Sequence, residues 1–375
     1  MRILYVHSAR GHLGDKIRIS KIHLFLRKKG FQVHEKWVDT EKLRAFVSGL
    51  MGLRHFLSSQ EEYNKIKTKS PLQVLVNSFF NSIQRQILKE AILVRPHIIV
   101  AETTPTGYFS LMAKNKLNIP LVTDVHGLMG EETEMRGSMF SQIISNVEIR
   151  AFHGSDYLLT VSKPMKRQIC IEHEVQADKV LLVPNGGDVQ RFQAHFSLPL
   201  KVIYAGNFAV YEKVSDYLEI AKAMEQTAPF VFFLMGDGIQ KREILSRIGK
   251  EKIPIKFMGL RTRQEALRIF SDMQVGVVPT TREVAFPIKV LDYMSCGLPV
   301  VAQRIGDWGE LIEKENCGIT IKENSVTEFV KALHSLRDKE EWTRKSRNGK
   351  KCTEGEYSWD LVLEPLGTLI ENIRA

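Results

Sequence analysis

The chain has 375 residues, a length typical of two domains, and its 43% hydrophobic and 26% charged residues fit a globular protein with a sizeable core. No apolar run approaches the length that spans a bilayer, and the first residues lack the features of a signal peptide. We therefore expect a cytoplasmic protein, or one bound peripherally to the cytoplasmic face of a membrane. Neither a zinc site nor a redox motif is indicated, because no C-x-x-C pair occurs among Cys170, Cys296, Cys317 and Cys352.

The net charge of +10 is unevenly distributed. The first 100 residues hold 18 Lys and Arg against 7 Asp and Glu, whereas the rest of the chain holds 35 against 36. Such asymmetry indicates an anionic membrane surface, a phosphorylated acceptor or nucleic acid as partner, or else a solvated basic face. We do not expect nucleic acid, because no nucleic-acid motif that interleaves basic and aromatic residues occurs.

The first part of the chain alternates predicted strands and helices. Residues 2–7 predict a buried strand, and residues 19–26 have the apolar spacing of a helix that ends at Gly30. The turn between them contains Gly11, His12 and Gly14, and such a turn between a strand and a helix can bind an anion or a sugar. A further helix is predicted at 107–116, and further strands begin at 31 or cover 98–101, 120–123, 157–161 and 180–183.

Residues 44–92 break this alternation. Apolar clusters such as Phe79-Phe80 are interleaved with basic residues such as Arg54, Lys65 and Arg85. Basic amphipathic segments can lie in a membrane interface, and we expect contact with an anionic membrane through residues 1–100. Ordinary helices packed on the first domain, with basic outer faces, are the alternative.

The second half of the chain repeats the α/β pattern. Strands alternating with helices imply parallel sheets covered on both faces, with a ligand site at the carboxyl ends of the strands. We place an N-terminal domain at 1–196, a C-terminal domain at 197–356, and an amphipathic helix at 357–375 that crosses back. The strands of the second domain are predicted at 201–205, 230–234, 255–257, 275–278, 299–302 and 318–321.

Residues 286–302 are the most specific stretch. Pro287 shapes the first turn of a helix, where free N–H groups can hold an anion such as a diphosphate. Lys289 lies in this turn, where it either contacts the phosphate or snorkels along the helix. Asp292 lies one to two turns in and can accept hydrogen bonds from a ribose diol, and Gly297 ends the helix.

This stretch closely resembles the signature of retaining GT-B glycosyltransferases of the family 4 type. Other segments resemble further motifs of that family in the same order, so the resemblance spans nearly the whole chain. These segments are 124–127, 160–162, 183–188 with Phe192, 204–207 with Lys213, 235–238, 257–261 and Trp359.

The resemblance implies a GT-B fold, in which two Rossmann-like domains face each other across a cleft. It also implies retaining, metal-independent transfer of a sugar from a UDP- or GDP-linked donor to a glycan or lipid-linked acceptor, with no cofactor besides this nucleotide-sugar substrate. His126 would face the donor sugar, and the acceptor would be held mainly by the first domain. The donor-binding residues would be Gly206, Asn207, Lys213, Gly236, Gly238, Gly259, Leu260, Arg261, Phe286, Pro287, Ile288, Lys289, Val290 and Asp292.

Several positions depart from the family pattern. Val284 stands where the family places an acid, eight residues before Asp292, which itself replaces a longer Glu. A one-residue shift of the loop would bring Glu283 into the role of orienting the transferred sugar, so we name Glu283 and His126 as the catalytic residues. Asn207 stands where many members have Arg, and Lys213 fits only if its loop carries one extra residue.

The departures at Val284 and Asn207 leave a second function open. A non-catalytic relative that binds a nucleotide sugar or a glycan, and regulates a partner, would tolerate both substitutions. Sugar transfer by the purified chain would exclude this alternative, and tight donor binding without turnover would favour it.

Overall fold

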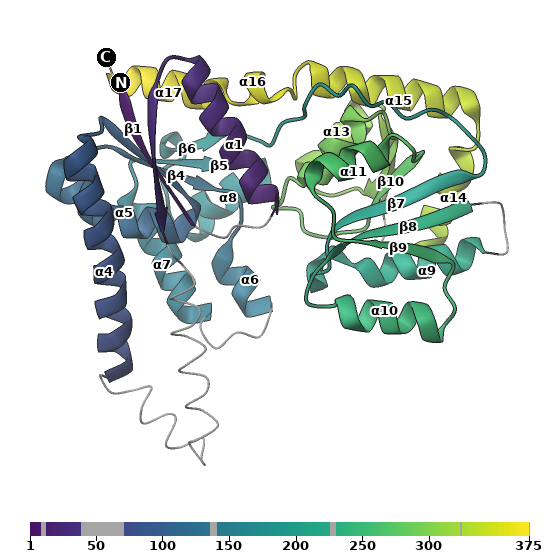
Figure 1. Cartoon of the computed structure of the whole chain (residues 1–375), viewed down its shortest axis with the longest axis horizontal. Coiled ribbons are helices and arrows are strands. Elements are labelled where there is room, and N and C mark those ends of the chain that lie inside the picture. The colour runs from purple at the N-terminus through teal and green to yellow at the C-terminus, as the bar shows by residue number, and fades with distance from the viewer. Residues whose placement is uncertain (9–12, 39–70, 136–140, 226–229, 323–324, 375) are drawn as a thin grey trace, which may run out of the picture. The chain divides into compact units, whose positions relative to one another are not determined.

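The computed structural model describes residues 1–8, 13–38, 71–135, 141–225, 230–322 and 325–374 (Figure 1). These residues form two compact units. Unit 1 comprises Met1–Thr160, Lys166–Leu182 and Pro365–Ala375, and unit 2 comprises Val161–Met165 and Val183–Glu364. Each unit contains one six-stranded parallel sheet with flanking helices, which confirms the predicted α/β class.

The sheet of unit 1 has the strand order β2-β1-β3-β4-β5-β6. Strands buried on both faces carry continuous apolar runs, and every residue of β3 and β4 is buried. The strands are β1 Arg2–Ser8, β2 Gln32–Val38, β3 Ile98–Glu102, β4 Leu121–Val125, β5 Tyr157–Thr160 and β6 Val180–Leu182. The helices are α1 Leu13–Lys28, α4 Pro71–Val94, α5 Thr103–Leu117, α6 Met129–Met135, α7 Ser141–Gly154, α8 Lys163–Glu172 and α17 Glu364–Arg374, and η1 Ala177–Lys179 is a 3₁₀ turn. The first residues of α8 and of α17 belong to unit 2.

The predicted membrane segment is described only from residue 71 onward. There it forms α4, whose Phe80, Ile83 and Ile87 are buried in the core of unit 1. For this part of the segment the structure therefore shows a helix packed on its own domain. Residues 44–70 lie outside the described ranges.

The sheet of unit 2 has the order β12-β11-β10-β7-β8-β9. The strands are β7 Leu200–Asn207, β8 Phe230–Asp237, β9 Ile255–Gly259, β10 Val275–Val278, β11 Val300–Gln303 and β12 Gly318–Ile321. The helices are α9 Val214–Met224, α10 Lys241–Lys250, α11 Arg263–Phe270, α12 Ile288–Ser295, α13 Gly306–Lys314, α14 Val326–Ser335, α15 Lys339–Glu354 and α16 Trp359–Val362, and η2 Val210–Glu212 is a 3₁₀ turn. Strand order reverses between β7 and β10, and parallel sheets bind ligands at the carboxyl ends of the strands beside such a reversal.

The main segment of unit 2 begins at Val183, earlier than the boundary expected at 196/197. The reason lies in the contacts of residues 183–196. The Asn185 side chain donates to the Phe286 carbonyl at 2.7 Å, and the Ala194 N–H donates to the Cys296 carbonyl at 2.8 Å. The connecting segment is thereby fastened to both ends of α12.

The expected single helix near the end of the chain is wrong, because the structure has two. Helix α16 ends at Val362, and α17 begins at Glu364 with Pro365 in its first turn. Proline lacks an N–H and clashes with the preceding turn, so a continuous helix cannot run through it, whereas a new helix can start there. Trp359 bonds to the Gly187 carbonyl within unit 2, and Gly367 packs on Phe25 within unit 1.

Candidate functional site

The end of β7 lies beside the strand-order reversal and contains two predicted site residues, Gly206 and Asn207. A Cβ atom at Gly206 would lie 2.9 Å from the Lys289 Nζ, so glycine here lets the ammonium group approach the strand closely. A Cβ atom at Gly236, whose φ is +144°, would lie 1.9 Å from the Gly206 carbonyl oxygen. A Cβ atom at Gly238, whose φ is +159°, would lie 2.5 Å from the Asn207 Oδ1. The structure thus brings Gly206, Asn207, Gly236, Gly238 and Lys289 together.

The start of α12 is held in place from two sides. Phe286 is buried, its ring stacks on Tyr357 with centroids 5.8 Å apart, and its carbonyl accepts the Asn185 bond. Pro287 is the N-cap residue, and no side chain caps the first N–H groups of the helix, which include those of Ile288 and Lys289. Uncapped N–H groups at a helix start are suited to bind a phosphate. Val290 is buried in the core and anchors the other face of this turn.

Lys289 does not snorkel along α12. Its Nζ lies 2.5 Å from the Glu212 Oε2 and 4.8 Å from the centre of the Tyr204 ring. Both partners of this ion pair have side chains only 13% exposed. The ammonium group therefore faces the end of β7, with its charge balanced by Glu212, and its contact with a phosphate stays a prediction.

Asp292 is held by an arginine that the sequence analysis missed. Arg263 Nη2 donates to Asp292 Oδ1 at 2.6 Å, and Nη1 donates to Asp188 Oδ2 at 2.7 Å. Burial lowers the pKa of Arg263, but the two carboxylates outweigh it and raise that pKa above its ordinary value. The Thr262–Glu265 capping box fixes Arg263 as the first residue of α11. A capping box predicts from the sequence where the helix starts, but it does not predict that Arg263 pairs with Asp188 and Asp292.

The end of β9 and the loop after it carry three of the predicted donor-binding residues, Gly259, Leu260 and Arg261. Gly259 has φ +71°, a left-handed conformation that favours glycine, and it turns the chain out of the strand. Leu260 is 63% exposed, and the exposed Arg261 folds back to donate to the Leu260 carbonyl. An exposed apolar side chain next to a guanidinium group can stack on a planar ring. The role of Leu260 and Arg261 in binding the donor stays a prediction.

The loop between β10 and α12 has its register fixed by two contacts. Val284 is buried, and its carbonyl accepts a 2.7 Å bond from the Ser162 hydroxyl. Gly306, with φ +56°, approaches so closely that a Cβ atom there would lie 2.4 Å from the Glu283 carbonyl oxygen. Glu283 is exposed in this arrangement. The structure thus turns Val284 inward and leaves Glu283 accessible, which fits the proposed one-residue shift of this loop. The catalytic role of Glu283 stays a prediction.

Two basic residues, Lys213 and Arg282, adjoin η2. Lys213 directly follows this turn, with a left-handed φ of +52°, and no side-chain partner for it is found within the described ranges. The Arg282 guanidinium lies over the Tyr211 ring, 5.1 Å from its centre. The sequence analysis did not name Arg282, because this stacking joins two loops far apart in the chain.

The predicted site residue of unit 1, His126, lies just beyond β4. Its Nδ1 is 3.7 Å from the Asp124 Oδ2, and its Nε2 is 4.0 Å from the Glu102 Oε1. Arg18 binds Asp124 through two bonds of 2.8 Å. Burial raises the pKa of Asp124, but Arg18 and His126 outweigh it and hold that pKa well below its ordinary value. The ionised Asp124 and the buried Glu102 thus place two acidic side chains beside the His126 ring.

A buried carboxyl group fastens the loop that follows His126. Glu148 of α7 accepts bonds from the Met129 and Gly130 N–H groups at 2.9 and 3.2 Å, and from the Thr104 hydroxyl at 3.1 Å. Burial raises the pKa of Glu148 to about 7, although these bonds oppose the shift.

The predicted loop at Gly11 and His12 lies outside the described residues, and Gly14 lies in the first turn of α1.

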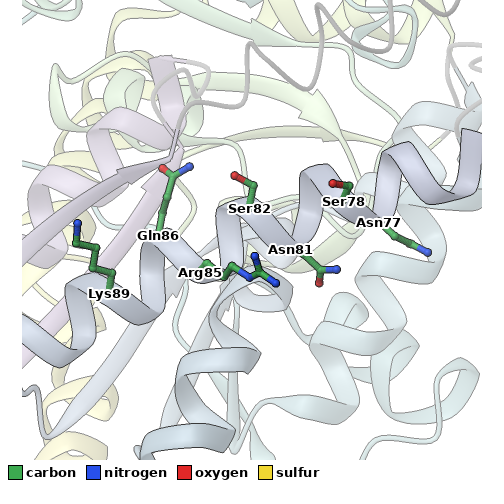
Figure 2. A pocket seen from close by; sticks show the side chains of 7 residues that line it. All are labelled: Asn77, Ser78, Asn81, Ser82, Arg85, Gln86 and Lys89. Carbon is green, nitrogen blue, oxygen red and sulfur yellow. The ribbon is translucent and has the colours of Figure 1, made fainter.

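A shallow groove lies away from these residues, on the polar face of α4 (Figure 2). It contains two cations, no acid, and none of the predicted site residues. Its lining consists of Asn77, Ser78, Asn81, Ser82, Arg85, Gln86 and Lys89.

Within the part of the chain that the structure describes, no group of three or more His, Cys, Asp or Glu could hold a metal ion. None of the described helices is both long enough and apolar enough to cross a membrane.

Two family models match the chain. The model of the glycosyl transferases group 1 matches residues 199–339, and the model of glycosyltransferase family 4 matches residues 60–191. Together they span most of both units.

Curated relatives agree with the family models. An uncharacterized glycosyltransferase of Methanocaldococcus jannaschii is 24% identical over 262 residues, covering 68% of this chain and 69% of the relative. Glycogen synthase of Mycobacterium tuberculosis is 21% identical over 277 residues, covering 72% and 67%. The UDP-Gal:alpha-D-GlcNAc-diphosphoundecaprenol alpha-1,3-galactosyltransferase of Escherichia coli is 24% identical over 260 residues, covering 64% and 66%.

Solved structures share the fold. Sucrose-phosphate synthase from Thermosynechococcus elongatus has a TM-score of 0.76 at 14% identity and covers 100% of this chain and 99% of its own. HepE of Anabaena, solved in complex with UDP-glucose, has a TM-score of 0.72 at 15% identity and covers 99% and 100%. These likenesses confirm the predicted architecture.

Proposed function

Because the chain belongs to the GT-B glycosyltransferases of the family 4 type, we propose that it is a retaining, metal-independent enzyme. It transfers a hexose from a UDP- or GDP-linked donor to a glycan or lipid-linked acceptor, in polysaccharide or glycolipid biosynthesis. The observation that carries this proposal is the meeting of Lys289, the uncapped start of α12 and the Gly206 turn at the strand-order reversal. A cation beside free N–H groups is what a leaving diphosphate needs.

The other predicted residues have complementary roles in this proposal. Asp292 accepts hydrogen bonds from the ribose, and Leu260 and Arg261 contact the base. Glu283 orients the transferred sugar from its exposed position. His126 faces the donor sugar, and the neighbouring Asp124 and Glu102 side chains hold its ring in position. Retention is proposed from the family and not from the geometry.

A uridine nucleotide is the first donor to test. HepE of Anabaena was solved with UDP-glucose, and the Escherichia coli relative is named for a UDP-galactose donor. The purified chain should release UDP or GDP from one of a panel of nucleotide sugars when membrane extract supplies the acceptor. Activity should persist in a chelator, and NMR of the product should show the anomeric configuration of the donor. Absence of nucleotide release from every donor would exclude the transferase reaction.

The membrane part of the proposal rests on other observations. The first 100 residues are strongly basic, and the Escherichia coli relative is named for an acceptor on a lipid diphosphate. Cosedimentation with vesicles containing phosphatidylglycerol, but not with neutral vesicles, is the expected result. Loss of this binding at high salt would confirm its electrostatic origin.

A non-catalytic donor-binding relative is the second candidate. It is favoured by Val284, a buried apolar residue at the position where the family has an acid. In that case the chain would bind a nucleotide sugar tightly and release no nucleotide with any acceptor.

A further inference from the structure

A buried arginine joins helix α1 to strand β4. The side chains of Arg18 and Asp124 are only 2% and 1% exposed. The Arg18 Nε donates to the Asp124 Oδ2, and its Nη2 donates to the Oδ1, both at 2.8 Å. Two parallel bonds of this kind fix the plane of a carboxylate as well as its position. The Asp124 carboxylate is therefore held in one orientation by α1.

Stability alone does not account for a charge at this position of α1. The residues on either side of Arg18, Ile17 and Ile19, are buried and apolar. A buried ion pair often contributes no more stability than well-packed apolar residues of the same volume, since both charges lose their hydration. An arginine between apolar neighbours therefore indicates a purpose beyond packing.

Asp124 also contacts the predicted site residue His126. The oxygen that accepts the Arg18 Nε bond, Oδ2, lies 3.7 Å from the His126 Nδ1. A shift of this carboxylate would move the group against which the imidazole ring rests. The orientation of His126 thus depends on Arg18 through one shared oxygen atom.

Glu102 borders the same imidazole ring from the neighbouring strand. It is the register partner of Asp124, so both carboxylates lie on the same face of the sheet. Its Oε1 lies 4.0 Å from the His126 Nε2, and its Oε2 accepts the Ser8 N–H at 3.2 Å. The next residue, Thr103, has a left-handed φ of +70°, which is strained for a β-branched residue and typical of functional sites. The imidazole therefore lies beside two carboxylates that are each anchored from another element.

We propose that Arg18 is a positioning residue for sugar transfer, because it holds the Asp124 carboxylate in the place that orients His126 toward the transferred sugar. This inference rests on the proposed function, since it requires His126 to face the donor sugar. Arg18 itself is too deeply buried to touch a substrate. Its removal should therefore slow the reaction without changing the affinity for the nucleotide.

The first test separates orientation from stability. The double variant Arg18→Met with Asp124→Asn removes both charges at similar volume, so its urea-unfolding midpoint should stay close to that of wild type. Its kcat for sugar transfer should fall about tenfold or more, while its affinity for UDP or GDP changes less than about twofold. The matched control is Arg27→Met, which removes an exposed arginine of the same helix and should keep the kcat of wild type.

Arg18→Lys is the second variant. A lysine keeps a positive charge beside Asp124, so no buried carboxylate is left unpaired and the chain should fold. It lacks the planar fork of the guanidinium group, so kcat should again fall about tenfold or more. This variant decides the question even if the double variant fails to fold.

A double-mutant cycle shows whether Arg18 acts through His126. In a His126→Ala background, Arg18→Lys should lower kcat by less than about twofold further, because the group that Arg18 orients is gone. A full further loss in that background would overturn the assignment, since Arg18 would then act by another route.

The remaining outcomes separate this assignment from the proposed function. The kcat of wild type in Arg18→Lys or in a folded double variant would overturn the assignment and leave Arg18 as a structural residue. The kcat of wild type in His126→Ala would also overturn it, although the transferase function would stand. If wild type transferred no sugar from any donor, the proposed function would be rejected together with the assignment.

Discussion

Lys289 and Glu212 form a 2.5 Å ion pair between the first turn of α12 and the 3₁₀ turn η2, with both side chains largely buried. We therefore expect the same lysine to serve two purposes, by stabilising the fold of unit 2 and by presenting a cation to the proposed donor site. Mutations can separate the two.

Lys289→Met should lower the free energy of unfolding by about 3 kcal/mol, because it leaves the Glu212 carboxylate buried without its partner. The double variant with Glu212→Gln should recover most of that stability while UDP or GDP still binds at least tenfold more weakly than to wild type. Urea unfolding and calorimetry measure the two quantities. Recovery of affinity together with stability would show that Lys289 is only structural.

Asp292→Asn should abolish recognition of the ribose hydroxyls. Wild type should bind UDP more tightly than its 2′,3′-dideoxy analogue by about tenfold, since a hydrogen bond to a carboxylate contributes about 1.5–3 kcal/mol. The variant should bind the two nucleotides equally. Continued discrimination by Asp292→Asn would place the ribose elsewhere, and would leave Asp292 as a partner of Arg263 alone.

Glu283→Gln should lower kcat at least 100-fold without changing the affinity for UDP, because UDP lacks the sugar that Glu283 is proposed to orient. Its effect on transition-state binding would then correspond to about 2.7 kcal/mol. Glu310→Gln removes an exposed acid of α13 and is the matched control. Equal activity of the two variants would show that the shifted register is not the solution to the missing acid at Val284.

Gly236→Ala should strongly destabilise unit 2, because the residue has φ +144° and its Cβ atom would lie 1.9 Å from the Gly206 carbonyl oxygen. Gly249→Ala is the opposite case, since Gly249 lies in α10 and nothing lies within 4 Å of a Cβ atom there. It should raise stability by up to about 1 kcal/mol. Thermal unfolding of both variants checks the contrast, and similar shifts would contradict the close approach of the two glycine turns.

Glu148 should make stability depend on pH. Because burial raises its pKa from 4.5 to about 7 in the folded chain, protonated Glu148 favours folding, and its contribution is full below pH 4.5. It is lost as the pH rises to about 7, which amounts to about 3 kcal/mol. The stability difference between wild type and Glu148→Gln should therefore vary over this range and be constant above it. Parallel pH profiles of urea unfolding would show that Glu148 does not titrate there.

The sequence predicted the strands and the start of α12 well, because continuous apolar runs and Pro287 are local signals. It could not predict the partners of Asp292, since Arg263 lies in another helix and only the fold brings them together. Arg282 was missed for the same reason, because its position depends on the ring of Tyr211. By contrast, the break between α16 and α17 had a local signal in Pro365, which the amphipathic pattern obscured.

Residues 365–374 complete unit 1 although they follow all of unit 2 in the chain. Leu366 and Ile370 of this segment are fully buried, so the core of unit 1 is incomplete without residues that follow unit 2 in the chain. A fragment that stops at Leu182 should therefore expose the apolar surface around Phe25 and aggregate. We therefore expect that unit 1 cannot be exchanged as one continuous module, and that a chimera between relatives must carry the closing segment together with the first one.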